Sequence, residues 1–189
     1  MIINYENFKR KTIIRALELE KYKYIIDHLY KCDVSKDEKF QKTFNAFYKV
    51  RRDEEWRKEF YKYFESIKNF QNITFETIVK DLLIRTGNIE ASFSSKLLST
   101  INPNMPIWDQ YVLKNLDLEV EGTDKTERML NTIEVYNEIV RKENEMLKEN
   151  EIKTEISKFQ EEFKEYKLTD IKALDYLLWN SRGEEDDGQ

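Results

Sequence analysis

Residues 101–116 read INPNMPIWDQYVLKNL, and this stretch holds both prolines of the chain. A residue that precedes proline is pushed out of the helical region, so Asn102 and Pro103 predict the end of a helix. Asp109 stands directly before QYVLKNL, where an N-cap carboxylate would accept a backbone N–H of the first helical turn. The stretch therefore predicts a helix, a proline-restricted loop and a second helix.

Outside this stretch the chain has few residues that interrupt helices. It contains four Gly and two Pro in 189 residues, which leaves few positions for tight turns and hairpins. Lys, Glu, Leu and Ile, which are abundant, favour or tolerate helices. We therefore predict an all-α protein, a single globular multi-helix domain over residues 1–182. The like-charged residues at 183–189 predict a disordered acidic tail.

Several helix ends follow from local signals in the sequence. Ser35 and Glu38 are spaced as in a capping box, where each side chain satisfies an amide of the other residue. Gly87 stands where a left-handed residue ends a helix. Three further residues are predicted N-caps: Asp53, Thr74 and Thr169.

Two stretches have a weaker helical pattern. Apolar spacing predicts one helix over about residues 5–18 and another over residues 22–30, YKYIIDHLY. Between about 141 and 151 the apolar stripe thins to Met146 and Leu147, which predicts a solvent-exposed segment or a junction of two helices. A short coiled-coil seam is a further alternative, although the heptad pattern is not sustained.

Composition excludes several kinds of site. Cys32 and His28 are the one cysteine and the one histidine, too few for an intrachain disulfide or a zinc site with four N or S ligands. The glycines form no nucleotide-binding loop, so we expect no metal and no cofactor. The N-terminal residues MIINYENFKRK carry early charges and no long apolar run, so we expect no signal peptide. No later run approaches roughly 18 to 20 apolar residues, and we expect a cytoplasmic protein without membrane contact.

Charge is unevenly distributed along the chain. Residues 1–68 carry 17 basic and 12 acidic side chains, whereas residues 117–189 carry 11 and 21. Basic side chains beside aromatic ones suit nucleic acid, because they neutralise phosphates while the rings stack on bases. The opposing interpretation is that Asp53 and the glutamates after it form ion pairs with these Lys and Arg side chains. The candidate nucleic-acid-binding residues are Lys9, Arg10, Lys11, Arg15, Arg51, Arg52, Arg57 and Trp108.

Residues 87–116, GNIEASFSSKLLSTINPNMPIWDQYVLKNL, resemble the carboxy-terminal part of the helix-hairpin-helix DNA glycosylase superfamily. In that superfamily a hairpin and a helix precede a Pro-Val-Asp loop, and Pro106-Ile107-Trp108-Asp109 is similar to that loop with one residue added. The later helices are also similar in their order. The same core resembles that of uncharacterised bacterial proteins.

The resemblance implies a glycosylase-like helical arrangement with Asp109 at the position of the catalytic aspartate, which in the family also caps a helix. It implies that Lys96 corresponds to the lysine that attacks the sugar, although Lys96 lies closer to the aspartate in sequence than that lysine does. Trp108 could stack on a flipped base, or fill a core. The chain departs from the family at the hairpin, which has only Gly87 and carries Glu90 nearby.

Two functions remain open at this point. The first is a non-catalytic helical adaptor or accessory protein, in a bacterial or phage defence setting, that binds a protein partner. The alternative is a nucleic-acid-binding protein or DNA N-glycosylase in which Asp109 assists departure of a base. The missing phosphate-binding hairpin and the net charge of −5 favour the adaptor, and thus a protein that is not an enzyme.

Overall fold

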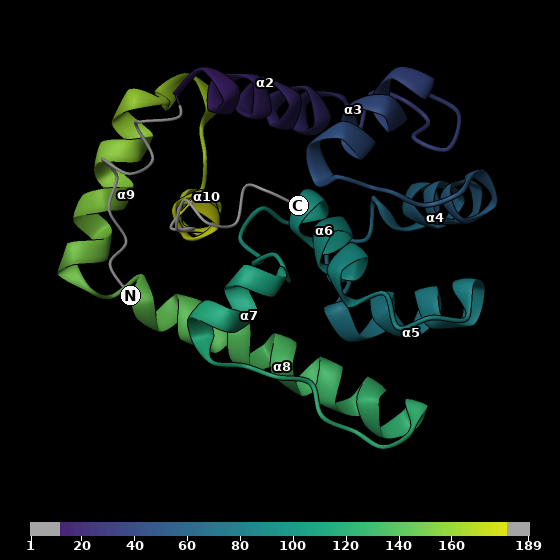
Figure 1. Cartoon of the computed structure of the whole chain (residues 1–189). Coiled ribbons are helices and arrows are strands. Elements are labelled where there is room, and N and C mark those ends of the chain that lie inside the picture. Colours follow the sequence, from purple (N-terminus) through teal and green to yellow (C-terminus); the bar gives the residue numbers. More distant parts are fainter. Residues whose placement is uncertain (1–11, 181–189) are drawn as a thin grey trace. The chain divides into compact units, whose positions relative to one another are not determined.

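The computed structural model describes the backbone of residues 12–180 and the side chains of residues 17–178. Over that range the chain forms nine α-helices and one short 3-10 helix, with no strand (Figure 1). The predicted all-α class is confirmed. The helices group into two compact units, Ile13–Asn102 and a second unit that includes residues 103–180. A single domain over 1–182 with a tail at 183–189 stays a prediction.

The first unit contains five helices. They are α2 (Thr12–His28), α3 (Glu38–Tyr48), α4 (Glu54–Ile67), α5 (Phe75–Thr86) and α6 (Ala91–Ile101). Helix α4 packs on α5, and α5 packs on α6. The faces that α3 and α4 bury are largely aromatic.

The core of this unit is built around Phe44, which is 0% exposed. Its ring centroid lies 5.6 Å from that of Phe64, 5.9 Å from that of Phe60 and 5.9 Å from that of Tyr61. These separations fall in the range where tilted and edge-to-face ring pairs attract one another beyond simple burial. The aromatic residues that recur every three or four positions along α4 therefore pack into one continuous aromatic cluster.

Most of the predicted helix ends are confirmed. Asp53 accepts the backbone N–H of Trp56 at 2.8 Å, and Thr74 accepts that of Thr77 at 3.2 Å. Gly87 ends α5 in the left-handed conformation with φ of 76°, which residues other than glycine rarely adopt. Helix α6 ends at Ile101, just before Asn102 and the proline that follows it.

The capping box predicted at Ser35 and Glu38 is wrong. Asp37 is the N-cap of α3, because its carboxylate reaches the Phe40 N–H at 2.8 Å. Ser35 instead donates its hydroxyl to Asp33 at 2.6 Å, within the preceding turn. Two separate helices over 5–18 and 22–30 are also incorrect within the described range, since α2 runs unbroken from Thr12 to His28 and no Gly or Pro interrupts it.

The second unit is arranged around its last helix. It contains α7 (Gln110–Leu116), α8 (Lys125–Met146), α9 (Asn150–Glu162), the 3-10 helix η1 (Lys164–Tyr166) and α10 (Asp170–Asn180). Helix α10, seen end-on in Figure 1, packs on α7, α8 and α9. Every residue from 171 to 178 is buried, and the Thr169 hydroxyl accepts the Lys172 N–H at 3.2 Å, as predicted for a cap.

Helix α8 buries one face whose residues recur at steps of three and four. The buried residues are Met129, Thr132, Tyr136, Ile139 and Glu143. The helix ends at Met146 and α9 begins at Asn150, so the predicted junction of two helices is confirmed. The prediction that this stretch is exposed to solvent is wrong at Glu143. This residue is 0% exposed, because it continues the buried face of α8 by one more turn.

No helix between residues 12 and 180 carries an apolar stretch long enough to cross a membrane.

Candidate functional site

Asp109 caps α7, as its place in the sequence predicts. Its carboxylate Oδ1 accepts the backbone N–H of Tyr111 at 2.9 Å, and its backbone is extended, as an N-cap requires. The side chain is half-buried, at the end of the 106–109 loop. A carboxylate in this position is held in one direction beside the positive end of the helix.

We expect Asp109→Ala to lower the free energy of unfolding by about 1 kcal/mol, because α7 loses its cap. Asp109→Asn is the matched control, since the asparagine side chain also caps helices. Urea unfolding of both variants measures the difference. An alanine variant as stable as the wild type would show that the cap does not stabilise the fold.

Three hydrogen bonds fasten the loop that leads to Asp109. The Tyr136 hydroxyl on α8 donates to the Pro106 carbonyl at 2.9 Å. The Ile107 N–H donates to Oδ1 of Asp175 on α10 at 3.3 Å. The Thr169 hydroxyl donates to the Pro103 carbonyl at 2.7 Å. Two helices distant in sequence thus determine where the loop and its aspartate lie.

Beneath the loop lies a buried ionic cluster, formed by Glu143, Lys172 and Asp175. Lys172 is 1% exposed and donates through Nζ to Asp175 Oδ2 at 2.9 Å. Both carboxylate oxygens of Glu143 are buried without a hydrogen-bond partner. The one ammonium group thus binds Asp175 and acts on Glu143 only through its charge, so a second negative charge in this buried site would be uncompensated.

Burial dominates the protonation of the cluster. It raises the pKa of Glu143 well above its ordinary value, and the charge of Asp175 raises it further, while Lys172 acts in the opposite direction. Burial also raises the pKa of Asp175, against the lowering effect of the Lys172 ammonium. A protonated Glu143 leaves the cluster neutral. These groups are almost inaccessible to solvent, and Asp175 is the member of the cluster that binds the loop, through the Ile107 N–H.

The residues predicted for catalysis and base stacking lie in different surroundings. Trp108 is 8% exposed, so its indole is packed and not presented to a base. Lys96 is half-buried on α6, with its ammonium 5.1 Å from the centroid of the Phe93 ring. It belongs to the first unit, whereas Asp109 belongs to the second.

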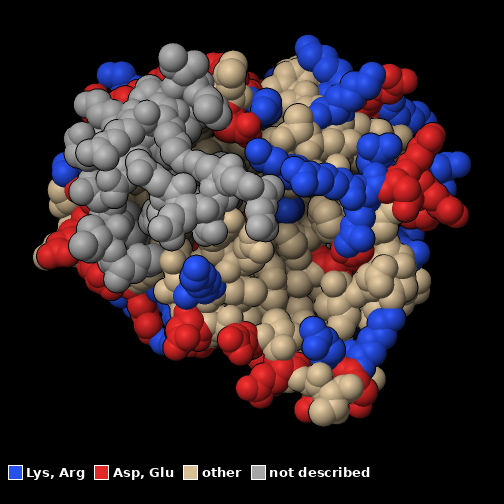
Figure 2. Space-filling view, viewed as in Figure 1, with Lys and Arg blue, Asp and Glu red and all other residues tan. Residues whose placement is uncertain are grey.

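The predicted basic residues are only partly described. Lys9, Arg10 and Lys11 lie outside the described residues, as does the side chain of Arg15. Arg51 is exposed and Arg57 is half-buried. Figure 2 shows several Lys and Arg side chains next to one another across the upper right of the face in view, with Asp and Glu side chains at the edge of this group.

Arg52 is held in the protein's own packing. Its guanidinium donates to Glu90 Oε2 at 2.8 Å and lies 5.5 Å from the Trp56 ring centroid. The Trp56 indole N–H donates to the other Glu90 oxygen at 3.1 Å. Glu90 is 4% exposed, and its two carboxylate oxygens anchor Arg52 and Trp56 at the start of α4.

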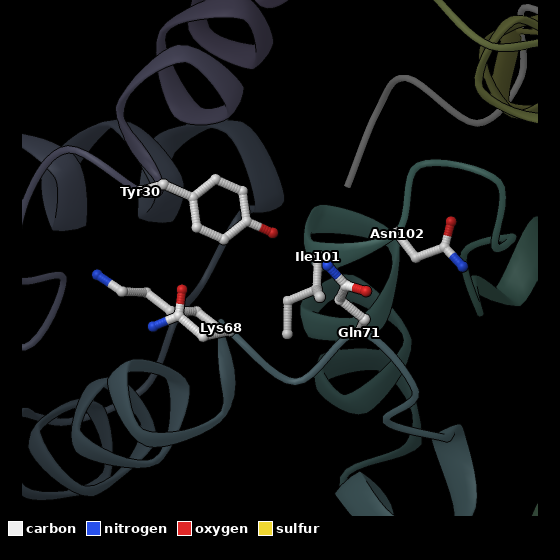
Figure 3. A pocket seen from close by; sticks show the side chains of 6 residues that line it. Tyr30, Lys68, Gln71, Ile101 and Asn102 are labelled. Atoms are coloured by element: carbon white, nitrogen blue, oxygen red, sulfur yellow. The ribbon is translucent and has the colours of Figure 1, made fainter.

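A pocket of about 240 Å³ opens in the first unit where α4 and α6 end. Its lining consists of Tyr30, Lys68, Asn69, Gln71, Ile101 and Asn102. Figure 3 shows the Tyr30 ring with its hydroxyl toward Ile101, while the Lys68 side chain extends away from Asn102. The Lys68 ammonium donates to the Cys32 carbonyl at 2.6 Å and pairs with Glu65 at 2.8 Å, so it is already engaged.

A second, open hollow of about 580 Å³ continues from this pocket along the α4–α5 connection. It shares Asn69 and Gln71 with the pocket and adds Phe70, Asn72, Ile73 and Thr77. We define the amide surface as Tyr30, Asn69, Phe70, Gln71, Asn72 and Asn102. Phe70 is 59% and Tyr30 58% exposed. Sequence reasoning missed this surface, although an aromatic residue among amides in KNFQNIT is an available signal.

Comparison of the chain with protein-family models, with curated proteins and with solved structures finds no match.

Proposed function

We propose that the protein is a non-catalytic helical adaptor that binds a protein partner through the amide surface. The observation that carries this proposal is the exposure of Phe70 and Tyr30 beside a lined pocket. Large aromatic side chains are enriched at the centres of protein interfaces, where they contribute most of the binding energy. A glycosylase-like arrangement of the helices is part of the proposal, on the sequence resemblance alone.

The chemistry of the surface favours an uncharged stretch of polypeptide as the occupant. Ten of the described residues line the pocket and the adjoining hollow, and among these ten Lys68 is the one that is charged. With 37% of the chain charged, about four would be expected. Side-chain amides both donate and accept, which matches the alternating N–H and C=O groups of a peptide backbone. A phosphate backbone would instead require several free Lys or Arg side chains.

The proposal is tested by placing a photo-crosslinking amino acid at position 70 in cells that make the protein. We expect one discrete crosslinked partner from position 70. Position 84 is the matched control, because Ile84 is 82% exposed on α5 and lies outside the amide surface. The same products from both positions, or none from position 70, would contradict the proposal.

With the purified partner, we expect Phe70→Ala to weaken binding at least about tenfold, the effect of a residue at the centre of an interface. The free energy of unfolding should stay within about 0.5 kcal/mol of the wild type, because Phe70 is exposed. Calorimetric titration and urea unfolding measure the two quantities. Ile84→Ala should change neither, and unchanged binding by Phe70→Ala would refute the assignment of the surface.

The second candidate is a nucleic-acid-binding protein or DNA N-glycosylase that uses Asp109. Its support is that Asp109 is half-buried, not fully buried, and that the cap occupies one of its two carboxylate oxygens. Release of a damaged base from duplex DNA, lost in Asp109→Asn at unchanged stability, would establish this candidate over the adaptor. Salt-dependent DNA binding without base release would support binding alone.

A further inference from the structure

The buried side chain of Glu143 destabilises the folded state of the second unit. Its side chain is fully buried on α8, and neither of its carboxylate oxygens has a hydrogen-bond partner. A buried polar group without a partner destabilises the folded state, and a buried charge without a partner does so more strongly. An apolar residue would continue the α8 face formed by Tyr136 and Ile139 without this cost.

The surroundings of Glu143 connect it to the 106–109 loop. On α10, the charge of Asp175 raises the pKa of Glu143 and the charge of Lys172 lowers it. Asp175 also accepts a hydrogen bond from the Ile107 N–H. From its own helix, Tyr136 lies two turns earlier on the same face and holds the Pro106 carbonyl. The charge of Asp109, at the end of the loop, raises the pKa of Asp175. A change of charge at Glu143 would therefore act on the groups that fasten the loop.

The other helices of the unit supply no described charge that could balance an ionised Glu143. On α7 the one charged side chain is Lys114, which is exposed. On α9 the charged side chains are exposed except for Glu155, which pairs with Lys158 at 2.6 Å. Lys172 is already engaged by Asp175. Among the described residues, the cluster is thus kept neutral by a proton on one of its two carboxyl groups. Asp175 has the hydrogen bond from the Lys172 ammonium that stabilises its charge, and Glu143 has none, so we assign the proton to Glu143.

We propose that Glu143, Lys172 and Asp175 form a proton-linked latch, which holds the 106–109 loop while Glu143 is protonated and releases it when Glu143 loses its proton. On ionisation, the new negative charge competes with Asp175 for the Lys172 ammonium and repels the Asp175 carboxylate. The Ile107 N–H then loses its acceptor, and the loop opens together with the cap at Asp109.

The direction of the pH dependence follows from linkage. In the closed state the pKa of Glu143 lies well above the ordinary 4.5, and in the open state solvent returns it toward that value. The closed state therefore binds the proton more tightly, and raising the pH favours opening. Between the two pKa values the opening equilibrium rises by up to about tenfold per pH unit, and it levels off above the closed-state pKa.

The test is amide hydrogen exchange of Ile107 in the full chain between pH 5 and 9, corrected for the intrinsic exchange rate. We expect wild-type protection to fall with pH at up to about tenfold per unit. In Glu143→Gln the fall should be much smaller, because the amide cannot ionise and Asp175 keeps its Lys172 partner. Glu134→Gln, which removes an exposed carboxylate of the same helix, should behave as the wild type.

Where Glu143→Gln fails to fold, Glu143→Met removes the titrating group in a different way and should give the same flat profile. Protection of Ile107 that is independent of pH in the wild type would overturn the latch. An equal slope in the wild type and in the Glu143 variants would do the same. The latch does not depend on the proposed binding of a partner at the amide surface.

Discussion

Phe44→Ala is expected to lower the free energy of unfolding by about 3–5 kcal/mol, the loss typical of a large buried ring replaced by a methyl group. Phe44 is fully buried, and the cavity would be lined by rings of α4 such as Phe60 and Phe64. Rigid rings held by one another cannot close around the space without leaving their rotamers. Urea unfolding followed by circular dichroism measures the loss.

Phe70→Ala is the matched control for this experiment, because it removes the same side chain from an exposed position. A loss below about 1 kcal/mol in Phe44→Ala would contradict the packing described for α3 and α4, since surface changes give losses of that size or less. Because the chain has two units, near-ultraviolet spectra should be recorded beside the far-ultraviolet signal, so that separate transitions are detected.

Lys172→Met is expected to cost about 3–5 kcal/mol at pH 8, the cost of removing one partner from a buried ion pair. Methionine fills a similar volume, so the loss reports the charge and not a cavity. Without the ammonium, Asp175 has no positive charge beside it in the buried site that it shares with protonated Glu143, and Asp175 must take up a proton as well. The cost should therefore shrink toward pH 5, where Asp175 takes up a proton more easily.

Lys158→Met provides the comparison for the charge change, because Lys158 pairs with Glu155 on the surface of α9 with a side chain that is 53% exposed. We expect its effect to stay within about 0.5 kcal/mol, as for most surface pairs. Urea unfolding of both variants at pH 5 and pH 8 measures the difference. If Lys172→Met lost the same stability at both pH values, the ion pair with Asp175 would not be what Lys172 contributes.

The helices and most of their ends could be predicted from the sequence, because they depend on neighbours a few residues apart. Asp53, Thr74 and Asp109 each cap the helix that begins one residue later. The error at Ser35 arose among several cap-forming residues close together, where Asp37 lies nearer to the start of α3. Such choices depend on turn geometry that spacing alone does not give.

The ionic cluster was missed although the sequence carries a signal for it. In IKALDYLL, residues 171–178, every side chain except Lys172 and Asp175 is apolar or aromatic. A helix that is apolar on all sides is buried on all sides, so its two charges must be buried and paired. What no local pattern gives is the third member, because Glu143 lies on another helix and reaches α10 only in the folded unit.

The two units also differ in when they can form during synthesis. The first unit, Ile13–Asn102, is one continuous segment, so all of its contacts are available once Asn102 has left the ribosome. The second unit packs α7, α8 and α9 around α10, which is made last of the four. Helices α7 and α8 also pack on each other, but until α10 emerges the parts of the apolar faces of α7, α8 and α9 that it covers stay exposed. A chaperone that binds the nascent chain is therefore expected to protect residues 110–162 rather than the aromatic core before them.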